Sequence, residues 1–483
     1  MTTTMASPAP ATHAGDAVHA SRTRNGRLEF LDTLRGIAAL VVALQHLSEV
    51  LWPSMLEWSH IWWRPGEFGV LVFFVCSGFI IPASMERRGD LTEFWIGRVF
   101  RLFPLYLAVL LVALALYATP WASPAQGYQP VVDSLINTTM LQVFSTRPIV
   151  IGASWTLGYE MVFYLLMTVL FMLGWNRRSA GIATGLFTSA LVLGGFLVPS
   201  FLIQPQIRSW PAVVIGLGAA ACLVILPRVA GRVNRSVALS VALLILMLFL
   251  NRPHDLWFSI LLIASMFLGT TLYRYDQGTI SRRTAGLTYG FAVAAVVVVE
   301  YCYQVGAPEP VTGAIPRWWT EAGTFVSAYL LFGGLFLLRR FGFPKVLVYL
   351  GTISYSVYLM HALVLMLPRP DLSRPIVFAG MLALTLGMSV VTYHFIEKPA
   401  QVFGRHVIGR YRARVGHDGP PAEPGEEARP RRAPGGAHAP ESAPPESAPP
   451  EAAPPDATSL ESRTGTAEPD HDRAAPPLHS GRH

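Results

Sequence analysis

The chain has 483 residues, of which 52% are hydrophobic and only 14% carry a charged side chain. Soluble domains are about one quarter charged, so this balance excludes an ordinary soluble protein and indicates an integral membrane protein. The formal net charge of +7 does not indicate nucleic-acid binding, because the basic residues lie in short clusters between apolar segments.

Membrane-length apolar segments fill the middle of the chain, between two tails of different composition. The segment 1–28 lacks the apolar core of a signal peptide, and the segment 413–483 is rich in Pro, Ala and Glu, so both predict disordered tails. The apolar segments predict transmembrane helices at 34–52, 67–84, 103–120, 155–175, 182–203, 210–227, 236–250, 255–273, 284–305, 322–340, 346–366 and 374–396. The segment 236–250 is short, so the expected number of spans is about 10 to 12.

The charges of the connecting segments predict the orientation in the membrane. Basic connections such as WNRRSAG and RRFGFPK alternate with connections of little positive charge, and the positive-inside rule places the basic ones in the cytoplasm. The sequence therefore predicts an all-α, polytopic transmembrane helix bundle in the cell membrane. Its membrane domain covers 29–412, and both disordered tails are cytoplasmic.

The first predicted span contains two residues that are costly in a bilayer. Arg35 and His46 are eleven residues apart, which places them on one helix face about 16 Å from each other. Ionisable side chains within a span are functional by default. The structural alternative is an arginine that extends to the interface and a histidine that is hydrogen-bonded inside the bundle.

The segment that enters the third predicted span contains an arginine pair. Arg98 and Arg101 are three residues apart and share a helix face, so they can hold phosphate groups with bidentate hydrogen bonds. The alternative is that both residues only anchor a cytoplasmic connection.

Two further predicted spans contain ionisable or hydroxyl-bearing side chains on one face. Trp155, Glu160 and Tyr164 occur near the start of the span at 155–175. A carboxylate there needs a partner, and we expect a histidine to supply it. Tyr358 and His361 share a face of the span at 346–366, although His361 alone could be an ordinary core histidine.

These residues belong to six motifs, which are LDTLRGIAALVVALQH, FFVCSGFII, RVFRLFPLY, SWTLGYEMVFY, SYSVYLMH and HFIEKP. Together and in this order, the motifs resemble the acyltransferase-three family of integral membrane O-acyltransferases, which includes O-antigen, exopolysaccharide and macrolide acyltransferases. The resemblance covers residues 29 to about 400. It implies that His46 is the catalytic residue, that Arg35 is its essential companion, and that Arg98 and Arg101 belong to the acyl-donor site.

The resemblance and the residue chemistry together predict an O-acyltransferase. An alcohol is a poor nucleophile at neutral pH, and a histidine is suited to remove its proton. We expect His46 to be this base, and Glu160 or His361 to be catalytic neighbours whose separate roles the sequence does not distinguish. The candidate substrate-binding residues are Trp155, Tyr164 and Tyr358.

The expected co-substrate is acyl-CoA, with acetyl-CoA preferred, and the expected acceptor is a hydroxyl of an envelope glycan, a glycolipid or a macrolide. The other expected partner is membrane lipid. We expect no bound cofactor, no metal ion and no nucleic acid. The sequence leaves open which acceptor is used, the length of the acyl chain and the oligomeric state.

Two other classes of protein remain possible from the residues alone. Many spans and buried charges are also typical of a transporter or flippase of a lipid-linked or glycosylated small molecule. The two halves of the chain show no evident repeat, which disfavours that alternative. The third hypothesis is a sensor or a non-catalytic scaffold that only binds lipid or glycan.

Overall fold

A computed structural model describes residues 13–195, 197, 199–200, 233–305 and 318–415, all within one compact unit, Met1–Gly425. The described residues form helices and contain no β-strand. The helices are α1 (His13–Leu51), α2 (Pro53–Ile61), α3 (Pro65–Arg88), α4 (Leu91–Leu116), α5 (Pro130–Asn137), α6 (Trp155–Met172), α7 (Ser179–Leu193), α9 (Val233–Leu250), α10 (Leu256–Asp276), α11 (Arg282–Gln304), α12 (Trp318–Leu337), α13 (Lys345–Thr352), α14 (Ser354–Val364), α15 (Arg374–Thr392) and α16 (Lys398–Val415).

The structure confirms the predicted all-α membrane architecture. Among the described residues, 8 helices are long and apolar enough to cross a membrane, or up to 9 if the bent pair α13 and α14 forms one span. Two shorter apolar helices, Ser179–Leu193 and Ser240–Leu250, occupy the predicted spans at 182–203 and 236–250. The predicted span at 210–227 lies outside the described residues.

The third span begins about three turns before its predicted start. α4 starts at Leu91 because Asp90 caps it, and the Asp90 carboxylate accepts a backbone N–H of the first turn at 2.8 Å. Gly89 ends α3 with a φ of 66°, a left-handed conformation that glycine adopts without strain. The segment that precedes the predicted third span is therefore helical from Leu91 on, and Arg98 and Arg101 lie inside the helix.

The predicted span at 346–366 is two helices that meet at an angle of 69°. Both halves pack on α1, but only α14 also packs on α4 and α15, which accompanies the break at Ile353. Gly351 on α13 approaches the backbone of Asp32 so closely that a Cβ atom would overlap its carbonyl oxygen. On α14, the Tyr355 hydroxyl donates a hydrogen bond to the Leu102 carbonyl of α4 at 2.8 Å.

The helices at both ends of the described chain are longer than predicted. α1 already begins at His13, inside the segment 1–28, because no proline interrupts the chain between Pro10 and Pro53. The predicted span at 374–396 continues to Val415 through a π-helical turn, Tyr393–Glu397, and α16.

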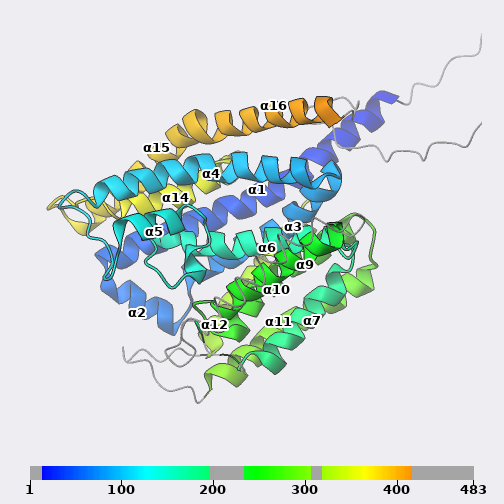
Figure 1. The fold of residues 1–483 in the computed structure, drawn as a ribbon, viewed down its shortest axis with the longest axis horizontal. Coiled ribbons are helices and arrows are strands. Elements are labelled where there is room, and N and C mark those ends of the chain that lie inside the picture. Colours follow the sequence, from blue (N-terminus) through cyan, green and yellow to red (C-terminus); the bar gives the residue numbers. More distant parts are fainter. Residues whose placement is uncertain (1–12, 196, 198, 201–232, 306–317, 416–483) are drawn as a thin grey trace, which may run out of the picture. The chain divides into compact units, whose positions relative to one another are not determined.

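α3 lies between two groups of helices (Figure 1). On one side it packs against α10 and α12, which in turn contact α7 and α11. On the other side it packs against α1, which also contacts α13, α14 and α15, while α16 packs on α4. The bidentate ion pair between Arg412 and Glu93, with both nitrogen–oxygen distances 2.6 Å, fastens α16 to the start of α4.

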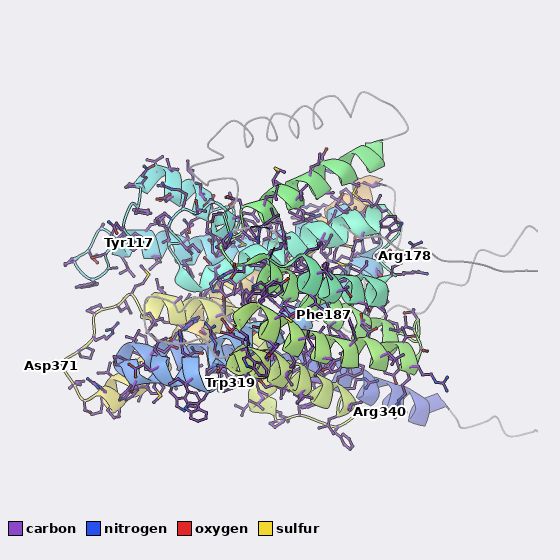
Figure 2. All side chains as sticks on the ribbon, turned by 90° about the horizontal axis from the view of Figure 1, so that it is seen from below. Tyr117, Arg178, Phe187, Trp319, Arg340 and Asp371 are labelled. Carbon is purple, nitrogen blue, oxygen red and sulfur yellow. The ribbon has the colours of Figure 1, made fainter. Side chains whose placement is uncertain are left out.

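The opposite ends of the helices differ in charge. Tyr117 and Asp371 lie at one end, and Arg178 and Arg340 lie at the other (Figure 2). We call these the loop end and the basic end. At the basic end, Glu86 of α3 pairs with the buried Arg274 of α10, with Nη1–Oε2 at 2.7 Å, which fixes the C-terminal ends of both helices together.

α3 and α10 approach each other closely. A Cβ atom on Gly78 would overlap the carbonyl oxygen of Met266, and one on Gly269 would overlap that of Val75. The Thr270 hydroxyl donates to the Gly78 carbonyl at 2.8 Å across the same contact. Small residues at a helix interface allow the backbones to approach closely. The resulting van der Waals contacts help to hold transmembrane helices together in lipid.

We expect Gly78→Ala to destabilise the protein by about 1–3 kcal/mol, because the added methyl group forces two packed helices apart. The measurement is the thermal unfolding midpoint of purified protein in detergent. Gly290→Ala on α11 is the matched control, since a Cβ atom there meets nothing within 4 Å. Equal midpoints for both variants would contradict this account of the interface.

Candidate active site

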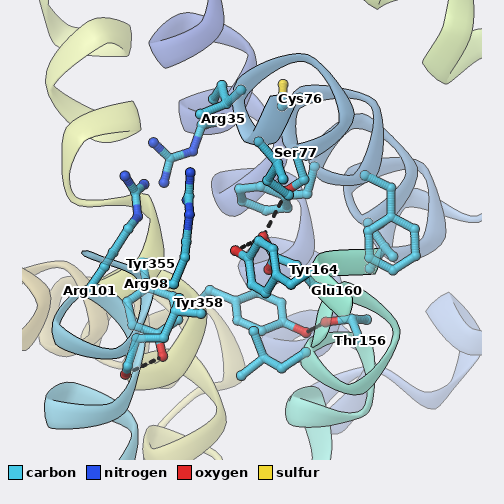
Figure 3. A pocket seen from close by; sticks show the side chains of 17 residues that line it. Arg35, Cys76, Ser77, Arg98, Arg101, Thr156, Glu160, Tyr164, Tyr355 and Tyr358 are labelled. Carbon is cyan, nitrogen blue, oxygen red and sulfur yellow. Dashed lines mark hydrogen bonds between the residues drawn. The ribbon is translucent and has the colours of Figure 1, made fainter. Parts of the chain in front are cut away.

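A polar cavity of about 80 Å³ lies among α1, α3, α4, α6 and α14 (Figure 3). Most of its polar lining comes from residues singled out in the sequence, and the rest from their neighbours in the same motifs. The polar lining residues are Arg35, Ser77, Arg98, Arg101, Thr156, Glu160, Tyr164, Tyr355 and Tyr358. Sequence reasoning missed Ser77, Thr156 and Tyr355, although each occurs within one of the six motifs.

Three guanidinium groups converge on one side of this cavity (Figure 3). Arg98 is 8% exposed, and its guanidinium carbon lies 5.3 Å from the centre of the Phe94 ring and 5.4 Å from that of Tyr164. Nη1 of Arg35 lies 3.8 Å from Oδ1 of Asp32, which is a long ion pair. Within the described residues, Arg98 and Arg101 form no ion pair. Among the residues that line the cavity, three guanidinium groups face one carboxylate, Glu160. Asp32 and Glu397, which do not line it, interact electrostatically with Arg35 and Arg101.

Glu160 faces the cavity from α6, but its partners are not the ones expected. Its Oε1 atom accepts hydrogen bonds from the Ser77 hydroxyl at 2.9 Å and from the Tyr164 hydroxyl at 2.7 Å. The prediction that a histidine pairs with Glu160 is wrong. The reason is the packing of α6, which directs this carboxylate toward Ser77 on α3 and toward Tyr164, one turn further along α6.

The two predicted histidines instead lie next to each other. The ring centres of His46 and His361 are 5.4 Å apart. Nδ1 of His361 is 3.3 Å from the carbonyl oxygen of Val357, so a proton on Nδ1 leaves Nε2 as an acceptor. His361 Nε2 and His46 Nδ1 are both buried, and neither has a hydrogen-bond partner in the part of the chain that the structure describes. Buried imidazole nitrogens without partners are costly, which makes this pair a candidate for proton transfer.

Tyr358 connects the histidine pair with the cavity. Its ring lines the cavity and lies 5.6 Å from the ring of His361, one turn further along α14. Its hydroxyl is 2.6 Å from the Thr156 hydroxyl and donates to the Ala153 carbonyl. His46 does not line the cavity, so Arg35 and His46 share one helix but contact different parts of the site.

Trp155, which was expected to bind substrate, lies outside the lining of the cavity. Its ring packs against His254, with ring centres 5.2 Å apart, and against Tyr159 at 6.0 Å. Tyr164 and Tyr358, the other two candidates, both line the cavity.

The connection between α4 and α6, at the loop end, is held by a buried carboxylate. Asp133 on α5 accepts hydrogen bonds from Arg147 Nε at 2.6 Å and Nη2 at 3.0 Å. Asn137 accepts a hydrogen bond from the Val150 N–H at 3.0 Å. The hydrogen bonds from Arg147 hold the pKa of Asp133 below its ordinary value of 3.8.

We expect the α4–α6 connection to loosen in acid. Because the folded-state pKa of Asp133 is depressed, the pairing stabilises the fold above about pH 4, and this stabilisation is lost as the pH falls through the folded-state pKa. The measurement is the protection of the backbone amides of residues 130–151 against hydrogen exchange at pH 7 and pH 3, each relative to the intrinsic exchange rate at that pH. Asp133→Asn should exchange faster than wild type at pH 7 and respond less to acid. Equal protection at pH 7 would rule out this role for Asp133.

The helix bundle and its cavity define a multi-pass membrane protein with a cationic, largely buried site. Residues 28–394 match the sequence model of the acyltransferase-three family, whose description is acyltransferase domain. The chain therefore belongs to the acyltransferase-three family, as the six motifs predicted.

Curated relatives include several proteins named as acyltransferases. Acyltransferase MdmB of Streptomyces mycarofaciens is 30% identical over 151 residues, which are 29% of this chain and 38% of MdmB. Putative peptidoglycan O-acetyltransferase YrhL of Bacillus subtilis (strain 168) is 24% identical over 413 residues, 79% of this chain and 56% of YrhL. O-acetyltransferase OatA of Staphylococcus aureus (strain NCTC 8325 / PS 47) is 27% identical over 199 residues, 37% of this chain and 30% of OatA.

The matched regions thus span between about a third and just over half of these relatives. No solved structure matches this chain.

Proposed function

We propose that this protein is an integral membrane O-acyltransferase. It transfers an acyl group, acetyl in the simplest case, from a coenzyme A thioester to a hydroxyl of a sugar-containing acceptor. The observation that carries the proposal is the convergence of Arg35, Arg98 and Arg101 on one cavity, in a chain that belongs to an acyltransferase family.

The arginines support an anionic donor that enters from the basic end. Like charges in a buried site repel one another, and an anionic ligand would add to the compensation that Asp32, Glu160 and Glu397 already give these guanidinium groups. Phosphate groups fit guanidinium geometry, and a coenzyme A thioester carries several. Arg98 and Arg101 lie in the half of α4 that follows the C-terminal arginines of α3, on the basic side of the bundle. The positive-inside rule assigns this end, and both termini, to the cytoplasm.

The histidine pair supplies the base in this mechanism. As the acceptor oxygen attacks the thioester carbonyl carbon, His46 removes the hydroxyl proton, and His361 stabilises the resulting imidazolium by accepting a hydrogen bond. The carbon–sulfur bond then breaks, and the coenzyme A thiolate takes the proton from the imidazolium. The histidine returns to its neutral state and an ester has formed.

The acceptor class rests on the family and on the printed names of the relatives. YrhL is named as a peptidoglycan O-acetyltransferase and OatA as an O-acetyltransferase, so a sugar hydroxyl is the acceptor we propose here.

The direct test uses the full chain in lipid nanodiscs with acetyl-CoA labelled in the acetyl group. The acceptor panel contains methyl glycosides of glucose, rhamnose and N-acetylglucosamine, and the disaccharide of N-acetylglucosamine and N-acetylmuramic acid. We expect label to appear in an ester on at least one sugar. If label stays on coenzyme A or is released only as acetate with every sugar, the proposed activity is wrong. Movement of unmodified sugar across proteoliposomes without ester formation would favour a transporter.

A further inference from the structure

A second hollow, which we call the outer groove, lies at the loop end of the bundle. Its volume is about 450 Å³, within the range of small-molecule binding pockets. Three chain segments form its walls, which are the end of α4 with the following turn, the connection that precedes α6, and the segment between α14 and α15. The lining residues are Tyr117, Trp121, Ala122, Ser123, Val150, Leu365, Met366, Leu367, Pro368 and Arg369.

α14 connects the outer groove with the histidine pair and the cavity. Tyr358 lines the cavity, His361 contacts His46, and Leu365 lines the groove. These positions on α14 and its C-cap are three and four residues apart, so they share one helix face over about 10 Å.

The segment 150–156, which packs against α14, also runs from the outer groove to the cavity. Val150 lines the groove and Thr156 lines the cavity, and the Tyr358 hydroxyl contacts Thr156 and Ala153 between them. The histidine pair therefore lies between two hollows, one cationic and one at the loop end.

The lining of the outer groove fits a sugar ring better than a lipid tail. Trp121 is 57% exposed and presents a flat apolar ring, while Ser123 and the exposed Arg369 offer hydrogen-bond donors. Among the described residues, Arg369 forms no ion pair. Trp121 and Arg369 both lie on connections beyond the ends of α4 and α14, where water solvates a glycan.

The groove wall is also fixed before any ligand binds. The rings of Tyr117 and Tyr128 pack edge to face, with centres 5.4 Å apart. Asn137 holds Val150 through its backbone N–H, and Tyr106 donates to the Asn137 carbonyl at 2.6 Å. A wall that is already ordered loses little conformational entropy on binding.

We propose that the outer groove is the acceptor site and binds the sugar ring whose hydroxyl is acylated, with Trp121 under the ring and Arg369 donating to a ring substituent. This inference rests on the proposed function. The acyl group then passes from a thioester in the cavity to a hydroxyl that reaches the histidine pair from the groove. The ester bond forms as the thioester carbon–sulfur bond breaks, and the hydroxyl proton goes to the imidazole and then to the thiolate.

The test compares Trp121→Ala and Arg369→Ala with wild type, using the full chain in nanodiscs, labelled acetyl-CoA and the sugar of the panel that wild type acylates fastest. We expect each variant to raise the KM for that sugar about tenfold or more and to leave the KM for acetyl-CoA unchanged. The matched controls are Trp62→Ala, a tryptophan that is 64% exposed outside both hollows, and Arg374→Ala, an exposed arginine at the start of α15. Both controls should behave as wild type.

Saturation-transfer NMR with the same four sugars, without acetyl-CoA, separates binding from turnover. Sugar binding that is lost in Trp121→Ala but kept in Trp62→Ala supports the groove as a sugar site. If wild type acylates a sugar and Trp121→Ala does so with unchanged sugar KM, the groove assignment is wrong and the proposed function stands. If Trp121→Ala lowers only the amount of inserted protein, the residue is an interface anchor and the assignment is also wrong. If wild type acylates no sugar, the proposed function itself is overturned.

Discussion

Replacing His46 by alanine is expected to lower the rate of acyl transfer by about 10²–10⁴-fold while the protein stays folded in the membrane, because the loss of a general base has this effect. Nδ1 of His46 is buried and has no hydrogen-bond partner among the described residues, so the folded state loses little when the imidazole is removed. The measurement is acyl transfer per mole of inserted protein, together with the thermal unfolding midpoint.

Two further variants show whether the histidine effect is specific. His361→Ala removes the neighbouring ring, and we expect a clear but smaller loss of rate. His394→Ala is the matched control, because its Nδ1 contacts the Val390 carbonyl at 2.9 Å as His361 contacts Val357, but the side chain is exposed. Near-normal specific activity in His46→Ala would refute the mechanism. Complete loss in His361→Ala alone would move the base to α14.

Replacing Arg98 by alanine is expected to raise the KM for acyl-CoA. A hydrogen bond to a charged group contributes about 1.5–3 kcal/mol, which corresponds to roughly 10- to 150-fold in affinity. Arg98 is 8% exposed and pairs with no carboxylate among the described residues, so its charge is available to an anionic ligand. The KM for the sugar acceptor should change little, because the outer groove lies at the other end of α14.

Controls for Arg98 must separate donor binding from packing against aromatic rings. Arg178→Ala is suitable, because Arg178 lies 5.5 Å from the Trp175 ring centre but is exposed at the basic end. Arg101→Ala provides a second, less buried test of the same cluster. Unchanged donor KM in the Arg98 and Arg101 double variant, with normal insertion, would leave these residues only a structural role.

The sequence by itself determined that the chain is a helical membrane protein and which family it belongs to. An apolar segment of about 20 residues satisfies its backbone in lipid only as a helix, so composition is enough to predict spans such as α3, α10 and α11. The spacing of Arg98 and Arg101 also placed both residues on one helix face, and in the structure both line the cavity.

Only the tertiary structure decided how these faces meet. Helical periodicity tells which residues share a face of one helix, but it does not tell which neighbouring helix that face contacts. For this reason the sequence paired Glu160 with a histidine, whereas packing pairs it with Ser77 and Tyr164. The contact of His46 with His361 depends on the bend between α13 and α14, which arises from long-range contacts with α1 and α4 that the local sequence of the span does not contain.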